Sequence, residues 1–352
     1  AINLRPQEQT AFGASYAYGM KWYEARDDEP VDQSHEVGLN LSHRFNPRYR
    51  VALNDSFVYS QEPELIDGAG RAQTTFVRSN LDAIRNRGAV EFNAGLTEVL
   101  GLALGYENAY YDYLDNDSLL STLLNRIEHQ VRVDGRYQAR PNLVGILGYQ
   151  YGRSDYTSDD PVNPLNPLSI AGSDRSSQTH SGYVGAEYTL SKKLSARGNA
   201  GVTYAVFDDL DEDAVSPYAD ISLTYRYLPG SQVQVGLRQE RNATDQVGAG
   251  VKGDVVTDQD STVLYGSISH RITPRVTGNL IGQFQHSIYN GGRLLDELAD
   301  NYLTLGLSLQ YKITPMFSVE TGYNYDRLDS DLGSIARSFT RNRVFVGLRA
   351  TY

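Results

Sequence analysis

The chain has 352 residues, with 32 lysines and arginines against 43 aspartates and glutamates, so its formal net charge is −11. It has no cysteine, which excludes disulfide bonds, thiolate metal sites and a cysteine nucleophile. The acidic balance argues against a protein that mainly binds nucleic-acid phosphates, and no stretch approaches the ~18 consecutive apolar residues of a membrane helix.

Stretches of about ten residues with alternating apolar side chains recur along the whole chain. The breaks between them are alternately long and short. Three short breaks contain Asn-Pro or Thr-Pro, which suits a tight turn because proline fixes φ and lacks a donor. The long breaks are polar, acidic and rich in Gly, Pro, Asn and Asp. The seven short breaks are 42–51, 96–100, 138–142, 190–194, 228–232, 269–276 and 310–317, and the eight long ones are 24–33, 61–73, 114–118, 158–177, 208–216, 244–260, 290–300 and 329–338.

These breaks separate about sixteen strands, and short turns at one rim with long loops at the other are typical of outer-membrane barrels. We therefore predict an all-β fold: a transmembrane antiparallel up-and-down β-barrel with short periplasmic turns and long extracellular loops. Residues 1–352 would form this single domain, with residues 1–9 as a periplasmic N-terminal segment. The predicted location is the outer membrane of a Gram-negative bacterium, with both termini periplasmic and a signal peptide already removed.

The alternation within the strands predicts an apolar exterior and a polar interior. Every second residue from Leu303 to Leu309 is leucine, whereas the residues between them are Thr304, Gly306 and Ser308. Successive side chains of a strand point to opposite faces, so each strand has one apolar and one polar face. A soluble β-sandwich also alternates. The length of the strands and the tyrosines near the ends of their apolar faces favour the membrane barrel.

A barrel of about sixteen strands is wide enough for an aqueous channel. Charged residues on the polar face are therefore candidates for the pore lining, where rings of charge set selectivity. The alternative is that these charges pair across strands and stiffen the wall. The predicted pore-lining residues are Arg126, Glu128, Arg132, Asp134, Arg136, Arg197, Asp220, Arg226, Arg238, Glu240, Arg271, Lys312, Glu320, Arg343 and Arg349.

Candidates for catalysis or cofactor binding are weak. Among the histidines, only His180, near Ser177 and Ser181, has neighbours that a barrel hydrolase could use. Residues 248–254 lack the spacing of a phosphate-binding loop, and the acidic run at 208–214 lacks the Gly and Glu positions of a calcium loop. We therefore predict no enzymatic activity, no cofactor and no metal site.

The strand–Asn/Thr-Pro–strand units at 42–57 and 268–276, together with Tyr and Gly alternation, resemble the putative β-barrel porin 2 family of Gram-negative outer membranes. The resemblance covers essentially the whole chain. It implies a porin-like barrel and brings no catalytic residues, and related barrels accompany exopolysaccharide export gene sets. The third long break is shorter than the constriction loop of general trimeric porins, so a narrowing loop would be the second (61–85) or the fourth (158–177).

The predicted function is passive diffusion of small hydrophilic solutes through an outer-membrane channel. Two alternatives remain: a conduit for secreted exopolysaccharide, and a structural or adhesive barrel with a closed lumen. The expected partners are outer-membrane lipid and lipopolysaccharide, the transported solute or polysaccharide, and the barrel assembly machinery, which would read the C-terminal strand ending at Tyr352. No nucleic-acid partner is expected.

Two features fit the pattern poorly. Asp55 shares the apolar parity of its strand and would face lipid, where a charge is unfavourable. Residues 77–87 show no clean alternation.

Overall fold

The computed structural model describes residues 1–24, 31–60, 83–114, 123–210, 213–244, 255–292, 295–331 and 338–351. Within these residues the chain forms seventeen strands and one short 3-10 helix, η1 (Ser173–Arg175). No helix in the described part of the chain is long and apolar enough to cross a membrane. The strands are β1 (Ile2–Gln7), β2 (Thr10–Trp22), β3 (Val31–Asn46), β4 (Tyr49–Ser60), β5 (Ala83–Gly95), β6 (Leu100–Tyr113), β7 (Arg126–Arg140), β8 (Leu143–Tyr156), β9 (Ser177–Thr189), β10 (Leu194–Phe207), β11 (Asp213–Leu228), β12 (Ser231–Asn242), β13 (Val256–Arg271), β14 (Val276–Gly291), β15 (Ala299–Lys312), β16 (Phe317–Ser330) and β17 (Phe339–Ala350).

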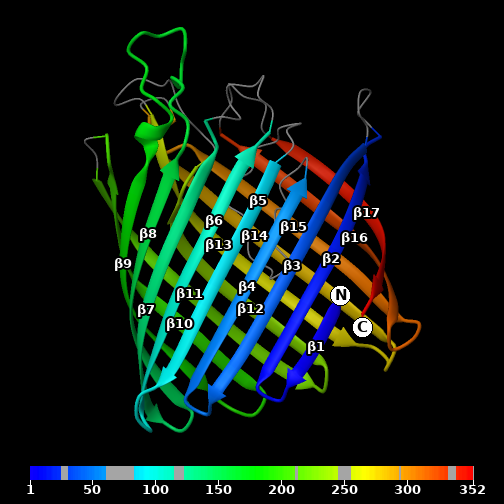
Figure 1. The fold of residues 1–352 in the computed structure, drawn as a ribbon. Coiled ribbons are helices and arrows are strands. Elements are labelled where there is room, and N and C mark those ends of the chain that lie inside the picture. Colours follow the sequence, from blue (N-terminus) through cyan, green and yellow to red (C-terminus); the bar gives the residue numbers. More distant parts are fainter. Residues whose placement is uncertain are drawn as a thin grey trace.

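Each strand pairs antiparallel with the next one along the chain, so the topology is up-and-down throughout (Figure 1). Strands β2 to β17 are the sixteen that the sequence predicts. The seven short connections between them contain two or four residues each and lie together at one end of the sheet, which we call the short-turn end. The eight longer connections lie at the opposite, long-loop end.

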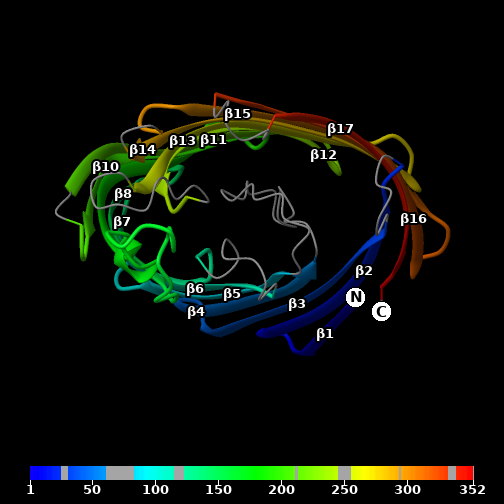
Figure 2. The same cartoon turned by 90° about the horizontal axis from the view of Figure 1, so that it is seen from above.

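Seen from above, the single sheet curls into an oval ring (Figure 2). Strands β2 to β17 are 12 to 16 residues long, which is well above the usual five or six of soluble proteins. In the described residues, buried apolar side chains form only small groups such as Tyr302 with Leu328 and Val256 with Tyr289. Two sheets packed face to face would share one continuous apolar core, so the β-sandwich alternative is wrong.

The predicted count of about sixteen strands and the predicted closure both need correction. Residues 2–7 of the predicted N-terminal segment form an additional strand, β1, which pairs with the first part of β2 through Ile2–Ala14 and Leu4–Phe12. Sequence patterning missed it because six residues are too few to establish a period. In an up-and-down sheet the first and seventeenth strands run in the same direction, so β1 cannot extend the antiparallel ladder to β17.

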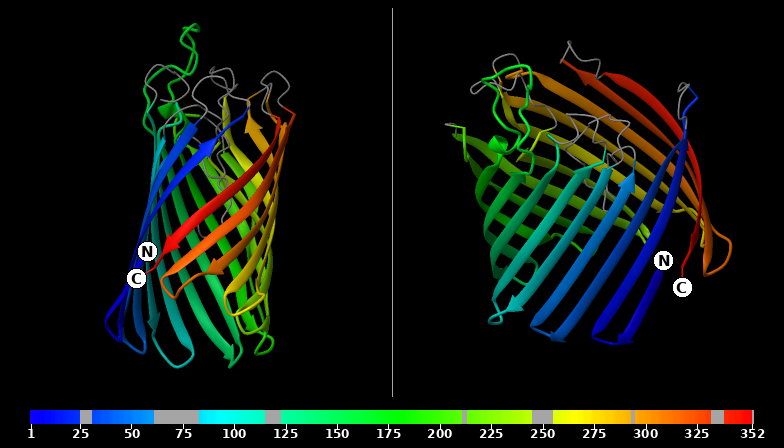
Figure 3. Two further views of the ribbon diagram at one scale, coloured as in Figure 1. Left: turned by 90° about the vertical axis from the view of Figure 1, so that its right-hand side faces the viewer. Right: turned by 45° about the horizontal axis from the view of Figure 1, so that its top comes forward.

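The two edges of the sheet meet only at their ends. The backbone nitrogen of Ala1 lies 2.7 Å from the carbonyl oxygen of Ala350, and the two chain ends lie side by side in every view (Figure 3). The described residues form no ladder between β17 and either β1 or β2. To close the barrel, β17 would have to pair with β2. β1 already pairs with the first part of that edge of β2, and this accounts for the open seam.

The two faces of the sheet differ as the alternation predicts. On β15, Leu305 and Leu307 are 44% and 54% exposed, whereas Tyr302 and Thr304 on the opposite face are 1% and 3% exposed. Because the exposed leucines cover the outside of the ring, the polar residues line its inside. The seam strand β17 follows the same rule, with exposed Val344, Val346 and Leu348 on the outer face.

Asp55 lies on the apolar outer face of β4, as its parity predicts. It is half-buried, and it stands opposite Gly88 in the β4–β5 ladder and opposite Leu39 in the β3–β4 ladder. The Asn86 amide nitrogen donates to both carboxylate oxygens, at 3.3 and 3.2 Å. A neighbouring amide therefore satisfies this outward carboxylate in part. Of the irregular segment 77–87, residues 83–87 begin β5 and the rest lies outside the described residues.

Candidate functional site

The structure places all fifteen predicted pore-lining residues on the polar face of the sheet, out of phase with the exposed apolar side chains. Their role in a pore remains a prediction. The same face carries further arginines that the prediction missed, although they obey the same alternation. Arg44 is in phase with Asn40 and Ser42, for example. The additional arginines are Arg44, Arg50, Arg85, Arg87 and Arg341.

The most buried charge of the wall is Asp326 on β16, which is 0% exposed. The hydroxyls of Tyr302 and Thr304 on β15 donate to its Oδ1, at 3.1 and 2.9 Å. On the other side, Arg341 Nε and Arg343 Nε of β17 donate to its Oδ2, at 3.1 and 2.9 Å. Arg343 Nη2 also donates to Oδ1, at 3.0 Å. One carboxylate thus joins the last three strands of the sheet.

A second network lies on β6 and β7. Arg126, 1% exposed, donates from Nε to Glu128 Oε1 at 2.7 Å, and its guanidinium lies 4.0 Å from the centre of the Tyr111 ring. Arg87 pairs with Glu107 at 2.5 Å on the adjoining strands. These charges neutralise one another along the wall.

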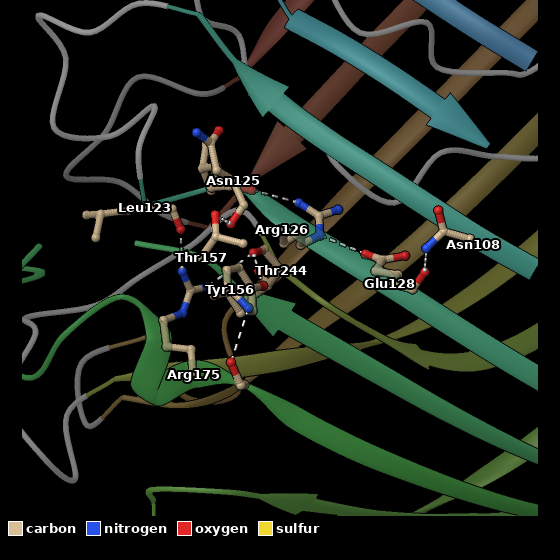
Figure 4. A network of polar contacts seen from close by, with 11 residues as sticks. Asn108, Leu123, Asn125, Arg126, Glu128, Tyr156, Thr157, Arg175 and Thr244 are labelled. Atoms are coloured by element: carbon tan, nitrogen blue, oxygen red, sulfur yellow. Dashed lines mark hydrogen bonds and ion pairs between the residues drawn. The ribbon is translucent and has the colours of Figure 1, made fainter. Parts of the chain in front are cut away.

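At the long-loop end, the connection between β8 and β9 is tied to the segment after β12. Arg175 in η1 donates from Nη2 to the Thr244 carbonyl at 3.2 Å, and the Tyr156 hydroxyl donates to the same oxygen at 3.3 Å (Figure 4). Arg175 Nη1 donates to the Leu123 carbonyl at 3.4 Å. Parts of the rim that lie far apart in the sequence are therefore joined here. Between these contacts the fourth long connection (157–176) rises beyond the strand ends (Figure 1).

A pocket of about 110 Å³ lies just inside this rim. Its lining comes from β6 to β9 on one side and from the ends of β12 and β13 on the other. It includes Glu107, Glu128, Arg153, Arg241 and Asp258. Sequence patterning did not identify this pocket, because it depends on which strands face each other across the ring.

In the middle of the wall, three aromatic rings lie against glycines. A Cβ at Gly148 would come within 2.1 Å of the Tyr183 ring, and Gly236 with Tyr265 and Gly322 with Phe345 are arranged in the same way. In each pair the glycine stands directly opposite the aromatic residue in the ladder. The absence of a side chain at the glycine lets the ring lie along the sheet. Tyr183 reaches across β8 in this way, and its hydroxyl donates to Asp134 Oδ1 on β7 at 2.5 Å.

Most of the other predicted charges of the middle wall also form ion pairs. Glu187 on β9 accepts from Arg136 at 2.5 Å and lies 3.7 Å from Arg197. Arg132 lies 3.5 Å from Asp134, and Arg238 lies 4.0 Å from Asp220. Glu240 and Glu320 are half-buried on the same face. The wall-pairing interpretation therefore fits the arginines named here and Arg126, Arg341 and Arg343.

The short-turn end differs. Six cations lie on the polar face of the strand ends there, and all six are exposed. No carboxylate of the described residues lies within 4.0 Å of any of them. We call this group the basic collar, and it consists of Arg44, Arg50, Arg226, Arg271, Lys312 and Arg349. Four of its members are among the predicted pore-lining residues.

The residues considered for catalysis are not brought together. His180 lies on the outer face, where its Nδ1 hydrogen-bonds the Tyr149 hydroxyl at 2.7 Å. Ser181, the next residue, faces inward and hydrogen-bonds Thr203 at 2.8 Å. Other histidines form similar outer-face pairs, such as His129 with Tyr106 at 2.9 Å. Among the described residues, no group of three or more His, Asp or Glu side chains is placed to hold a metal ion.

Three solved structures are among those that match the chain. The copper transporter OprC shares 9% identity at a TM-score of 0.49, over 97% of this chain and 62% of its own. The FrpB iron transporter from Neisseria meningitidis shares 7% sequence identity at a TM-score of 0.49, and the match covers 92% of this chain and 58% of the transporter chain. The ferric yersiniabactin uptake receptor FyuA from Yersinia pestis shares 11% sequence identity at a TM-score of 0.40, and the match covers 93% of this chain and 58% of the receptor chain. The chain thus spans about six-tenths of the length of these structures.

No curated protein matches the chain significantly. A family model does: the one described as putative beta-barrel porin 2 matches residues 166–352, which is just over half of the sequence. This stretch contains most of the glycine-backed rings, the Asp326 network and four members of the basic collar. The chain therefore belongs to the putative beta-barrel porin 2 family.

Proposed function

We propose that the protein is an outer-membrane channel through which small hydrophilic solutes diffuse passively. In this proposal the short-turn end faces the periplasm and the long-loop end faces the outside, as in other outer-membrane barrels. The observation that carries it is the distribution of side chains over the two faces of the curled sheet, which is the reverse of that in a soluble protein. Apolar side chains cover the outside, and charged and hydrogen-bonding side chains cover the inside. Family membership supports the same function.

The arrangement of the inner wall supports an aqueous interior. Its charges pair mostly with residues on the same or nearby strands, such as Arg136 with Glu187 and Arg343 with Asp326. Large rings lie along the wall over glycines, as Tyr183 does over Gly148. Among the described residues, side chains held against the wall leave the axis to water, whereas a barrel with a closed lumen would use such side chains to fill it.

The rim at the long-loop end favours small solutes over a secreted polysaccharide. There the segment after β12 contacts Tyr156 and Arg175, and the pocket of about 110 Å³ is lined from both sides of the ring. These contacts narrow one end of the ring. A conduit for a polymer would need a wide passage through both ends.

The remaining partners are also proposals. Outer-membrane lipid and lipopolysaccharide would contact the exposed leucines and valines of the outer face. The barrel assembly machinery would read β17, although the terminal Tyr352 lies outside the described residues.

Planar-bilayer recording with detergent-refolded protein tests the proposal. We expect discrete conductance steps that small neutral polymers reduce and large ones leave unchanged, because only the small ones enter the bore. Folding should be verified on the same sample by heat-dependent electrophoretic mobility. A folded protein that inserts into the bilayer without any conductance would contradict the channel and favour a closed, structural barrel.

A further inference from the structure

We propose that the basic collar is an anion-binding site at the short-turn mouth and that the channel consequently prefers anionic solutes, those with carboxylate or phosphate groups. This inference rests on the proposed channel function and specifies its solute class. Two sets of cations on the inner wall of the sheet differ in their partners. Most arginines on the wall of the middle and the long-loop end have carboxylate partners, such as Arg126 with Glu128 and Arg136 with Glu187, whereas the collar residues have none among the described residues.

Pairing within the sheet does not account for the collar. Arg44 and Arg50 stand directly opposite each other in the β3–β4 ladder. Lys312 and Arg349 flank the same residue, Ser318, in the β15–β16 and β16–β17 ladders. Like charges at neighbouring positions of a ladder are destabilising. A ligand of opposite charge would offset this repulsion.

At one collar position, the local backbone leaves room for the cation. Gly230 in the turn between β11 and β12 has a φ of 77°, and a Cβ there would come within 2.6 Å of the Arg271 guanidinium. The backbone nitrogen of Arg271 donates to Ser231 Oγ at 2.9 Å. The guanidinium therefore lies directly over a turn that has no side chain to displace it. The planar guanidinium of Arg271 is suited to binding carboxylate or phosphate through two nitrogens.

The positive charge of the collar contrasts with the negative charge of the rest of the protein. The protein as a whole carries a net charge of −11, and the long connections at the other end are rich in Asp and Glu. The short turns next to the collar add the exposed cations Arg48, Lys192, Lys193 and Arg275 against one exposed carboxylate, Glu98, so positive charge is in excess there. Charge of one sign at a mouth raises the local concentration of the opposite ion, and rings of arginine and lysine select anions in pores.

The test is the reversal potential across a planar bilayer under a potassium chloride gradient. We expect chloride to be favoured over potassium by about twofold to tenfold. In the quadruple variant R226Q/R271Q/K312Q/R349Q the channel should still conduct, and this preference should be lost. Inorganic phosphate added on the short-turn side should reduce the chloride current of the unmodified channel and not that of the variant.

Two single variants provide a matched comparison. Arg271→Gln removes one charge from the collar, whereas Arg327→Gln removes one from an exposed pair with Asp329 on the outer face. Only the first should lower the chloride preference. If the channel conducts but favours potassium, or if the chloride preference survives in the quadruple variant, the basic collar does not select anions. The proposed channel function would be unaffected by either result. Absence of conductance in a folded, inserted protein contradicts the channel itself and the solute class with it.

Discussion

Replacing Asp326 by alanine is expected to lower the free energy of unfolding by about 3–5 kcal/mol. The carboxylate is fully buried and accepts from Arg341 and Arg343 on β17 and from two hydroxyls on β15. Its removal takes from Arg341 and Arg343, whose side chains are 11% and 28% exposed, the buried carboxylate that both of them contact. The effect should be large because β17 has no ladder on its other side in the described residues, so this network and the β16 ladder hold it.

Urea titration followed by heat-dependent gel mobility measures this loss. The matched control is Asp329→Asn, three residues further along the same strand. Asp329 pairs with Arg327, but both side chains are more than half exposed, so this change should have little effect. Equal stability of the Asp326 variant and the unmodified protein would show that the network does not hold β17.

Replacing Leu307 by arginine is expected to destabilise the membrane-inserted protein by about 2–4 kcal/mol. Leu307 is 54% exposed and lies at the centre of the apolar face of β15, between Leu305 and Leu309. On a wall that faces lipid, the guanidinium would have to leave water near the middle of the bilayer. Equilibrium unfolding from lipid vesicles gives the difference directly.

The control is the same substitution one residue further along. Ser308 lies on the polar face of β15 opposite Asn279 and Gly322, so an arginine there would extend into the aqueous interior. Ser308→Arg should be close to neutral in stability. If the two variants were equally stable, or if Ser308→Arg were the more harmful, the assignment of the two faces would be wrong.

The strands and turns could be predicted from the sequence because they depend on local signals. Alternation with a period of two defines each strand, and Asn46-Pro47, Thr273-Pro274 and Thr314-Pro315 mark turns that the structure places between strands. Parity also assigns each charge to a face, since a strand exposes alternate side chains on opposite sides. This is why all fifteen predicted residues lie on the polar face.

Partners of those charges could not be predicted, because they depend on the register between strands. Arg136 and Glu187 are 51 residues apart and meet only through the ladders of β8 with its two neighbours. Arg226 and Arg271 have the same parity pattern as Arg136 in sequence, yet they have no carboxylate partner in the described residues. The open seam could not be predicted for the same reason, because it depends on pairing between strands far apart in the sequence. It depends on whether β1 or β17 pairs with β2, and the alternation of each strand is compatible with both.

In the proposed channel, the apolar face of the sheet contacts lipid and the polar face contacts water. Because the chain has no cysteine, single cysteines can be introduced without background. Each single-cysteine variant is inserted into lipid vesicles and treated with a charged, membrane-impermeant thiol reagent. The variants place the cysteine at neighbouring positions of two strands. Gln130→Cys and Gln310→Cys should react, whereas Val131→Cys and Leu309→Cys should not. Reaction at the apolar positions with protection at the polar ones would contradict the account.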